Sequence, residues 1–363
     1  MNSRTLKAAG ACGVALAALI TAACSSGSSA PSSSNSAKSK PYTIYLSNNF
    51  VGNDWRQQME RVAQVAAGKE PFKGHVALHI ENADSTVQAQ INSLNNIIRT
   101  RPDAILVDAA SDTALNPTIT KACNAGIVVI SFDQTVTAPC AYAVASDWNM
   151  IPAVLAEWMA HELNGKGDVL VDRGLAGAPI SKQISDGYEK VLQQNPGIHA
   201  VGYFDGQYAL GPEQQGVASL LAAHPRIDGI LTQGYGTGAL KALQDAGRPV
   251  VPFTAFSYNG SAVACAQTPG AHCILGANPA WLSAEALKLA VSILDTGKKP
   301  AEREQMVRAD FLTSDPFTSK LYPQAKMEKI EIGKNAFPNL PPGLTLPVSP
   351  HWMTITAEEA AGK

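Results

Sequence analysis

The sequence AGIVVISFDQ, residues 125–134, combines the end of a helix, a buried strand and a polar tip in one short stretch. Gly126 suits the left-handed position that follows many helices, because it has no Cβ. Residues 127–130 are all apolar, which is typical of a parallel strand covered by helices on both faces. Asp133 and Gln134 follow at its carboxyl end, the edge where open α/β sheets bind ligands. We therefore predict that they bind something small and polar; the alternative is that Asp133 only caps a turn.

The overall composition predicts a globular, soluble protein of about two domains. The chain has 363 residues, of which 45% are hydrophobic, enough to bury two cores of ordinary domain size. Lys and Arg number 28 against 30 for Asp and Glu, so the net charge is −2. Because no basic block stands out, we expect no nucleic acid and no anionic membrane surface as a partner.

Residues 1–24 resemble a lipoprotein signal peptide. Two basic residues precede an Ala-rich run, residues 8–23, that is too short and too weakly hydrophobic for a membrane span and that leads to Cys24. Thr21 departs from the usual motif, which has an aliphatic or a smaller residue there. We predict export, lipidation of Cys24, and anchoring to the membrane on its extracytoplasmic side, either periplasmic or at the cell surface. Residues 25–40 are Ser-rich and read as a flexible tether.

Four cysteines remain once the one in the signal peptide and the lipidated one are set aside: Cys123, Cys140, Cys265 and Cys273. An exported protein meets an oxidising compartment, and four cysteines allow three disulfide connectivities. We favour Cys123 with Cys140 and Cys265 with Cys273, because each pair is close in sequence and falls within one βα region. The spacings do not match a zinc site, so we expect no metal.

Strands and helices alternate along the first part of the chain. Strands are expected at residues 42–46, 75–80, 104–107 and 127–130, with helices starting near residue 54 and spanning 85–99 and 115–125. Ser85 and Gln88 form a capping-box pattern at the start of the second helix. The order is βαβαβαβ.

The same layout then repeats, which predicts two similar lobes. IIRTRPDAILVDA (97–109) is echoed by LLAAHPRIDGILTQ (220–233), and KACNAGIVVISF (121–132) by KALQDAGRPVVPF (241–253). In the second lobe we expect helices at 148–163 and 180–194 and strands at 168–171 and 200–203. A strand at 273–276, a helix at 280–294 and a strand at 306–311 follow. The Pro-rich tail, residues 336–363, shows no periodicity.

Three segments carry a family resemblance: VVISFDQ (128–134), AVASDWN (143–149) and GLAGAPISKQISDGY (174–188). With the signal and the two lobes, residues 42–310 resemble the periplasmic sugar-binding proteins of ABC importers, in the ribose-binding-like branch of type I substrate-binding proteins. The resemblance implies an α/β fold of two Rossmann-like lobes, residues 41–146 plus 277–309 and 147–276 plus 310–335. Strands crossing near Ser146, Ala277 and Ala309 would join them, and the lobes would close on a ligand like a Venus flytrap.

The resemblance also implies a set of ligand contacts: Asn48, Asn49, Asn53, Trp55, Asp133, Gln134, Lys182, Tyr208, Tyr235, Ser257 and Asn278. Of these, Asp133 matches the aspartate with which the family accepts hydrogen bonds from sugar hydroxyls. Gln134 and Lys182 stand where the family has arginines, and Tyr235 and Ser257 where it has carboxylates. These departures argue against ribose itself.

The residue types fit a polyol or sugar independently of the resemblance. Each hydroxyl both donates and accepts, so a tight site needs carboxylate, amide and amine partners, and a buried unpaired hydroxyl costs about 1–3 kcal/mol. Aromatic rings supply flat walls for the C–H faces, from Trp55, Tyr208, Tyr235 and a further candidate, Trp281. The alternatives are that these rings pack in the core and that Lys182 is simply solvated.

We therefore predict a monomeric solute-binding lipoprotein that captures a small carbohydrate or polyol and delivers it to an ABC permease, without a cofactor and without catalysis. AHEL (160–163) lacks the second histidine of a zinc helix, and the sequence has neither a G-x-S-x-G elbow nor a P-loop lysine. Two alternatives remain: a lipoprotein that presents its ligand to a sensor or chemoreceptor, and a binding protein for a non-sugar solute. A repressor of the same fold would need a helix-turn-helix where this chain has an export signal.

Overall fold

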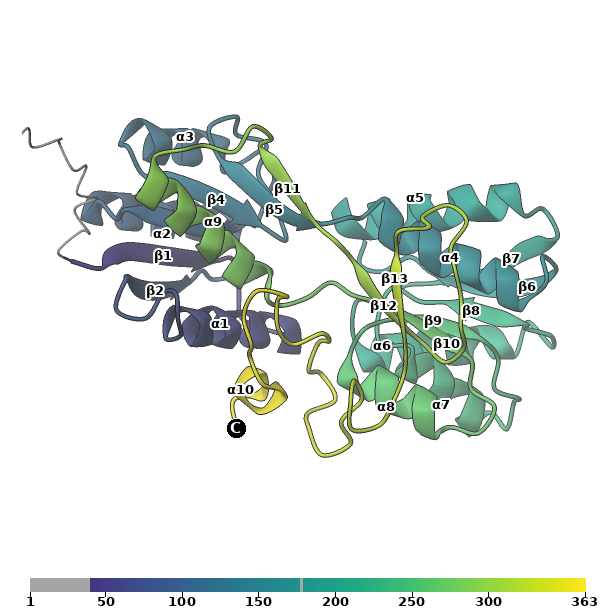
Figure 1. Cartoon of the computed structure of the whole chain (residues 1–363). Coiled ribbons are helices and arrows are strands. Elements are labelled where there is room, and N and C mark those ends of the chain that lie inside the picture. The colour runs from purple at the N-terminus through teal and green to yellow at the C-terminus, as the bar shows by residue number, and fades with distance from the viewer. Residues whose placement is uncertain (1–39, 177–178) are drawn as a thin grey trace, which may run out of the picture. The chain divides into compact units, whose positions relative to one another are not determined.

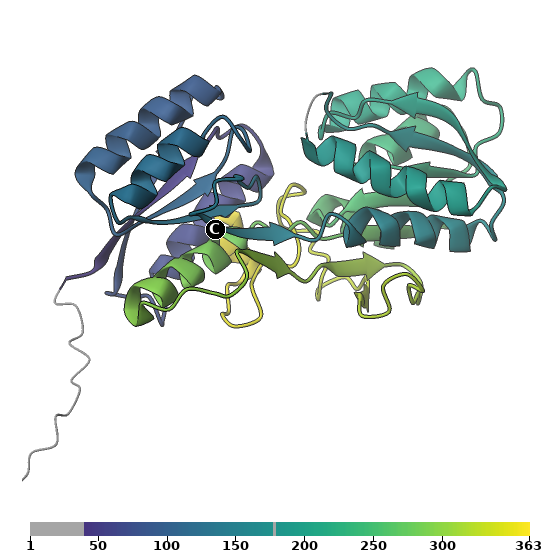
Figure 2. The same ribbon diagram turned by 90° about the horizontal axis from the view of Figure 1, so that it is seen from above.

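The computed structural model describes residues 40–176 and 179–363 and contains two parallel-rich sheets, each with helices on both faces (Figure 1, Figure 2). This confirms the predicted α/β fold of two lobes. The predicted signal peptide, its Cys24 and the tether up to residue 39 lie outside the described residues. Within the described ranges, no helix is both long enough and apolar enough to cross a membrane.

The N-terminal lobe is built on a six-stranded, all-parallel sheet in the order β11-β5-β4-β3-β1-β2. Its strands are β1 (Tyr42–Asn48), β2 (Val76–Asn82), β3 (Ala104–Asp108), β4 (Val128–Phe132), β5 (Tyr142–Ser146) and β11 (Glu304–Val307). One face packs against α1 (Asp54–Ala67) and α9 (Leu282–Thr296), and the other against α2 (Val87–Thr100) and α3 (Asn116–Asn124). Burial on both faces explains the continuous apolar run of β4.

The C-terminal lobe is built on a seven-stranded sheet in the order β13-β12-β10-β9-β8-β6-β7, parallel except where β12 runs against β10. Its strands are β6 (Gly167–Asp172), β7 (Ile198–Phe204), β8 (Gly229–Leu231), β9 (Phe253–Phe256), β10 (Cys273–Gly276), β12 (Asp310–Thr313) and β13 (Lys326–Lys329). Helices α4 (Met150–Glu162) and α5 (Pro179–Gln194) cover one face. Helices α6 (Leu210–Leu221), α7 (Thr237–Asp245) and α8 (Asn259–Gln267) cover the other.

The chain passes between the two sheets at three places. Residues 147–149 connect β5 to α4, residues 277–281 connect β10 to α9, and residues 308–309 connect β11 to β12 (Figure 1). The loops after β1, β4, β6 and β9 all leave from carboxyl ends of parallel strands. These loops and the connecting segments supply most of the polar groups described below.

Both predicted disulfides are confirmed. Cys123 of α3 is bonded to Cys140, just before β5, and Cys265 of α8 is bonded to Cys273 of β10, each with a Cα–Cα distance of 6.3 Å. Each bond therefore ties a helix to the sheet region that it covers. Gly126 has a φ of 81°, as its position after α3 predicts.

The start of α2 and the strand expected at 306–311 differ from the predictions. Ser85 has a φ of 54°, outside the extended range of an N-cap, and Thr86 caps α2 instead by accepting from Ala89 N at 3.1 Å. The strand at 306–311 is two strands, β11 and β12, because the chain changes sheet between them. Strand β5 is not predicted from the sequence, although it ends at Ser146, where a crossing is expected.

The tail is more structured than its sequence predicts. It ends in a short helix, α10 (Ala357–Ala361), that packs beside α1 (Figure 1). Six buried tail residues join the same apolar core as residues of both lobes: Ala336, Leu344, Leu346, Met353, Ile355 and Ala360. No periodicity reveals them, because prolines separate the apolar positions and each position is held by residues far away in the sequence.

Candidate ligand-binding site

A cavity of about 190 Å³ is lined by residues of both lobes, of a connecting segment and of the tail. Its lining comprises Phe50, Asn53, Trp55, Arg56, Asp133, Gln134, Trp148, Leu175, Ile180, Tyr208, Phe256, Ser257, Tyr258, Asn278 and Thr345. A wider hollow of about 740 Å³ shares Asp133, Gln134, Trp148 and Ile180 with it. Pockets for drug-sized ligands measure about 300–1,000 Å³, so the inner cavity suits a smaller solute.

Asp133 follows β4 directly and is held in an unusual backbone conformation. Its φ is 54°, in the left-handed region that non-glycine residues seldom adopt, and its side chain is 8% exposed. Such conformations cost free energy and cluster at ligand sites. Asn278 Nδ2 donates to Asp133 Oδ1 at 3.0 Å. Burial raises the pKa of Asp133, whereas the charge of Arg56 and the hydrogen bond from Asn278 act to lower it.

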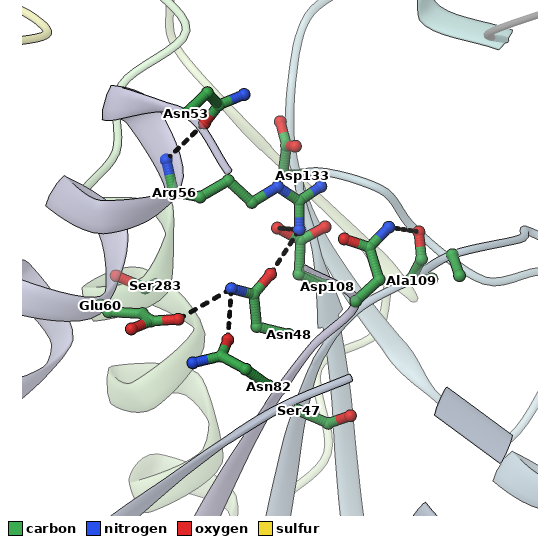
Figure 3. A network of polar contacts seen from close by, with 12 residues as sticks. Ser47, Asn48, Asn53, Arg56, Glu60, Asn82, Asp108, Ala109, Asp133 and Ser283 are labelled. Carbon is green, nitrogen blue, oxygen red and sulfur yellow. Dashed lines mark hydrogen bonds and ion pairs between the residues drawn. The ribbon is translucent and has the colours of Figure 1, made fainter. Parts of the chain in front are cut away.

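Arg56, in the first turn of α1, is the buried cation of the site (Figure 3). Its Nη1 lies 2.6 Å from Asp108 Oδ2 and donates to Asn48 Oδ1 at 2.5 Å. The guanidinium carbon lies 4.7 Å from the centre of the Phe50 ring. Burial raises the pKa of Asp108 well above its usual range, and the charge of Arg56 opposes that rise. One cation thus faces two buried carboxylates, Asp108 and Asp133.

Asn48 orients this network from behind. Its Nδ2 donates to Glu60 Oε1 and to Asn82 Oδ1, each at 2.8 Å, so its carbonyl oxygen is turned toward Arg56 (Figure 3). Glu60 comes from α1 and Asn82 from the end of β2. The amide therefore links three elements and positions the arginine without itself lining the cavity.

Asn278, in the segment that connects β10 to α9, joins several parts of the site. Its Oδ1 accepts from Ser146 Oγ at 2.7 Å, and its Nδ2 donates to Asp133. Its backbone oxygen accepts from Trp55 Nε1 at 2.8 Å. Because Ser146 ends β5, this single residue connects two crossings with α1 and with the carboxylate.

Aromatic rings form the side of the cavity that the C-terminal lobe supplies. Trp148 packs edge-on against Phe256, with ring centres 5.9 Å apart. Tyr208 has a φ of 53°, its hydroxyl lies 2.6 Å from Ser181 Oγ, and burial raises its pKa to about 12. Its hydroxyl is therefore neutral at physiological pH. Tyr258 completes this side and stacks on Tyr235 with ring centres 4.2 Å apart.

Two buried polar atoms of the lining have no partner among the described residues. These are Trp148 Nε1 and Ser257 Oγ. Leaving a buried donor or hydroxyl unpaired costs about 1–3 kcal/mol. A solute with hydroxyl groups could satisfy both atoms. Among all residues that the structure describes, no three His, Cys, Asp or Glu side chains lie close enough together to hold a metal ion.

The structure brings most of the predicted contacts together and places others elsewhere. The cavity is lined by Asn53, Trp55, Asp133, Gln134, Tyr208, Ser257 and Asn278. Asn48 and Asn49 lie outside this lining, and Tyr235 lies behind Tyr258. The Lys182 side chain is 76% exposed and pairs with Asp186 one turn along α5. Trp281, the further candidate wall, is buried in the core.

Arg56, Trp148 and Thr345 are the polar lining residues that sequence reasoning missed. Arg56 could have been noticed in the sequence, because a cation in the first turn of a helix is unfavourable next to the positive end of the helix dipole. Its presence there indicates that a carboxylate pairs with it. Trp148 was read as the first residue of a helix, but α4 starts at Met150. Thr345 carries no local signal. The remaining missed residues are apolar or aromatic: Phe50, Leu175, Ile180, Phe256 and Tyr258.

Comparisons with known proteins agree on one family. The model of the periplasmic binding protein domain matches residues 44–299. The xylitol-binding protein of Mycolicibacterium smegmatis is 26% identical over 68% of this chain and 67% of its own length. The ribose import binding protein of Bacillus subtilis is 23% identical over 73% and 86%. An ABC transporter solute binding protein of Thermobispora bispora superposes with a TM-score of 0.66 at 25% identity, covering 78% of this chain and 87% of its own.

Proposed function

The chain belongs to the periplasmic binding protein domain family, and from that premise we propose that it captures a small carbohydrate or polyol between its lobes and delivers it to an ABC permease. Proteins of this family bind solutes outside the cytoplasm and are not enzymes. Two relatives are named for binding xylitol and for ribose import, and the structural relative from Thermobispora bispora is named as an ABC transporter solute binding protein.

One observation carries the proposal: a buried carboxylate and flat aromatic rings line the same small cavity. An ionised Asp133 carboxylate acts only as a hydrogen-bond acceptor, so it suits the O–H groups of a sugar or polyol. The rings of Trp55, Trp148 and Tyr208 offer apolar faces to C–H groups. The proposed contacts are Asn53, Trp55, Arg56, Asp133, Gln134, Trp148, Tyr208, Ser257 and Asn278. We leave Asn48, Asn49, Lys182 and Tyr235 out of the proposed site.

The remaining parts of the proposal concern the organisation of the chain. The lobes would comprise residues 41–146 plus 277–309 and 147–276 plus 310–335, with residues 336–363 as the tail. Cys24 would carry the lipid that anchors a monomeric protein to the membrane. A Cys24→Ser variant should leave the membrane fraction for the soluble exported fraction, and retention of the variant at the membrane would rule out this anchor.

The binding itself is tested by heating the full-length protein in detergent with a panel of pentoses, hexoses and polyols that includes xylitol and D-ribose. A ligand present at 100 times its Kd stabilises the folded state by about 2.7 kcal/mol, which raises the unfolding temperature measurably. Mass spectrometry of the denatured protein would identify any solute that purified with it. An unchanged unfolding temperature across the whole panel would contradict a carbohydrate or polyol ligand.

Delivery to a permease is tested in cells. Deletion of the gene should abolish uptake of the radiolabelled solute that stabilises the protein, and the wild-type gene should restore it. Normal uptake combined with a lost behavioural or transcriptional response to the solute would favour the sensory alternative.

A further inference from the structure

Part of the tail, which we call the strap (residues 337–346), is bonded to the C-terminal lobe beside the cavity. Asn259, in the first turn of α8, accepts from Phe337 N at 2.8 Å, and its Nδ2 donates to Phe337 O at 2.9 Å. Thr345 forms an antiparallel bridge with Tyr258, and Leu346 N donates to Ser257 O at 2.7 Å. The strap therefore follows the loop after β9, which itself lines the cavity.

The same strap is bonded to the N-terminal lobe through one buried amide. Gln58 of α1 accepts from Thr345 N at 2.6 Å and from Thr345 Oγ1 at 3.0 Å, and its Nε2 donates to Thr345 O at 3.0 Å. Both side chains are buried, at 1% and 3% exposure. Every polar group of Thr345 thus has a partner on α1, which fixes where this residue meets the cavity.

Two glycines show how closely the strap lies against both lobes. A Cβ on Gly343 would come within 1.7 Å of Asp54 Oδ2 in α1. A Cβ on Gly260, in α8, would come within 2.8 Å of Pro342 Cβ. Neither position has room for a side chain unless the strap moves. The strap is therefore held between α1 and α8 by contacts that tolerate little displacement.

We propose that the strap is a wall of the solute-binding site, that Thr345 limits the size of the solute, and that Gln58 is its positioning residue. Thr345 lines the cavity, although the family match ends at residue 299. The inference rests on the proposed function and extends it, because it assigns part of the selectivity to a segment outside the matched domain. The solute concerned is a small neutral polyol or sugar.

The test measures Kd by calorimetry on the full-length protein with erythritol, xylitol and sorbitol, and with D-erythrose, D-ribose and D-glucose. Thr345→Leu, which adds bulk, should weaken binding of six-carbon probes about tenfold more than that of four-carbon probes, since one methylene in a pocket changes affinity by about 10–200-fold. We call the Kd for a six-carbon probe divided by the Kd for the four-carbon probe of the same series the size ratio. Thr345→Ala should shift the size ratio the other way. Thr354→Leu is the matched control, because Thr354 is an exposed residue of the same tail.

Two further variants test how the strap is held. Gln58→Met keeps the shape but not the amide, and it should shift the size ratio in either series while the protein stays folded. Gly343→Ala should shift it as well by displacing the strap from Asp54. Gly211→Ala is its control, because a Cβ there meets nothing within 4 Å. A lower unfolding temperature with an unchanged ratio would make Gln58 merely structural and overturn its assignment.

The outcomes separate this inference from the proposed function. If the wild-type protein binds none of the six probes, nor any other member of the sugar and polyol panel, the proposed function fails and the inference falls with it. If the wild type binds but Thr345→Leu and Thr345→Ala keep its size ratios, the function stands and the strap is not a wall of the site. An equal loss of affinity for all sizes would also overturn the inference.

Discussion

The two lobes meet the cavity with different chemistry. The N-terminal lobe contributes charges beside the rings of Phe50 and Trp55, with Arg56 and Asp133 in the lining and Asp108 buried behind them. The C-terminal lobe contributes rings, among them Trp148, Tyr208 and Phe256. Each charge on the first side is already engaged by the protein, whereas the second side keeps unpaired atoms such as Trp148 Nε1.

The difference indicates a division of labour. One cation faces two buried carboxyls, so the N-terminal side offers more acceptor oxygens than positive charge and favours hydroxyl donors over an anionic solute. The aromatic side supplies area and excludes water, which strengthens the polar contacts opposite. The charged side should therefore decide whether a solute binds, and the aromatic side how well it fits.

The largest expected effect comes from removing the cation of the charged side. Arg56→Met leaves Asp108 buried without its partner, and breaking a buried ion pair in this way costs about 3–5 kcal/mol. We expect the free energy of unfolding in urea to fall by that amount. Arg61→Met is the control, because Arg61 lies on the same helix and its partner among the described residues is the Ala360 carbonyl. A loss below about 1 kcal/mol would show that the network does not depend on the arginine.

The C-terminal lobe also buries a carboxyl, that of Glu213. It extends the comparison because no cation of the described residues pairs with it. Glu213 accepts from Tyr235 N and Ala239 N, at 2.9 and 3.0 Å, and burial raises its pKa to about 7. The folded state therefore holds this proton more tightly than the unfolded state, whose pKa is about 4.3. Glu213 should contribute stability below pH 4.3 that is lost as the pH rises to about 7.

Over this window the loss amounts to about 4 kcal/mol, since each pKa unit is worth about 1.4 kcal/mol. Glu213→Gln should abolish this part of the pH dependence when urea unfolding is followed from pH 4.5 to pH 8. Exposed Glu358→Gln is the control. If the Glu213→Gln variant keeps the wild-type slope, another group titrates.

Asp133→Asn tests the charged side by affinity. The variant loses the negative charge and gains a donor, so binding of the best solute should weaken about 30-fold, in line with about 2 kcal/mol for a hydrogen bond to a charged group. Stability should not fall, because burial penalises the ionised form of this carboxyl. Calorimetry and urea unfolding measure the two effects, with exposed Asp112→Asn as the control. Unchanged affinity would place Asp133 outside the site.

The smallest expected effect belongs to the aromatic side. Trp148→Phe keeps a ring but removes an N–H that has no partner among the described residues, so affinity should fall about fivefold while stability is maintained. Trp158→Phe is a matched control. The indole nitrogen of Trp158 is also buried without a partner among the described residues, but Trp158 lies on α4 in the hydrophobic core, away from the cavity lining. Equal affinities in both variants would mean that the Trp148 nitrogen does not contact the solute.

Local patterns were sufficient for the fold and for part of the site. The apolar run of β4 and the cysteine pairs are short-range signals, and the structure follows them. The position of Asp133 at the end of β4 could be predicted for the same reason. Lys182 could not be placed this way, because only the rotation of α5 decides whether its side chain faces the cavity or water.

Arg56 and Thr345 were missed because their partners are distant in sequence. Arg56 acquires its role from Asp108, which belongs to β3, and Thr345 from Gln58, which belongs to α1. Neither pairing has a periodicity or a motif. Residues of this kind become visible only when the sheet order brings β1 and β3 together and the tail returns to the first lobe.

The late return of the chain to the first sheet has a consequence for biosynthesis. Helix α9 and strand β11 belong to the N-terminal lobe but follow β6 to β10 in the chain. During synthesis or export from the N-terminus, the face of β3, β4 and β5 that α9 covers must wait until residues 282–296 emerge. Until then this apolar face is exposed to solvent, which makes the partly synthesised chain prone to aggregation. The central strands of the second lobe, in contrast, emerge as one continuous segment and can assemble first.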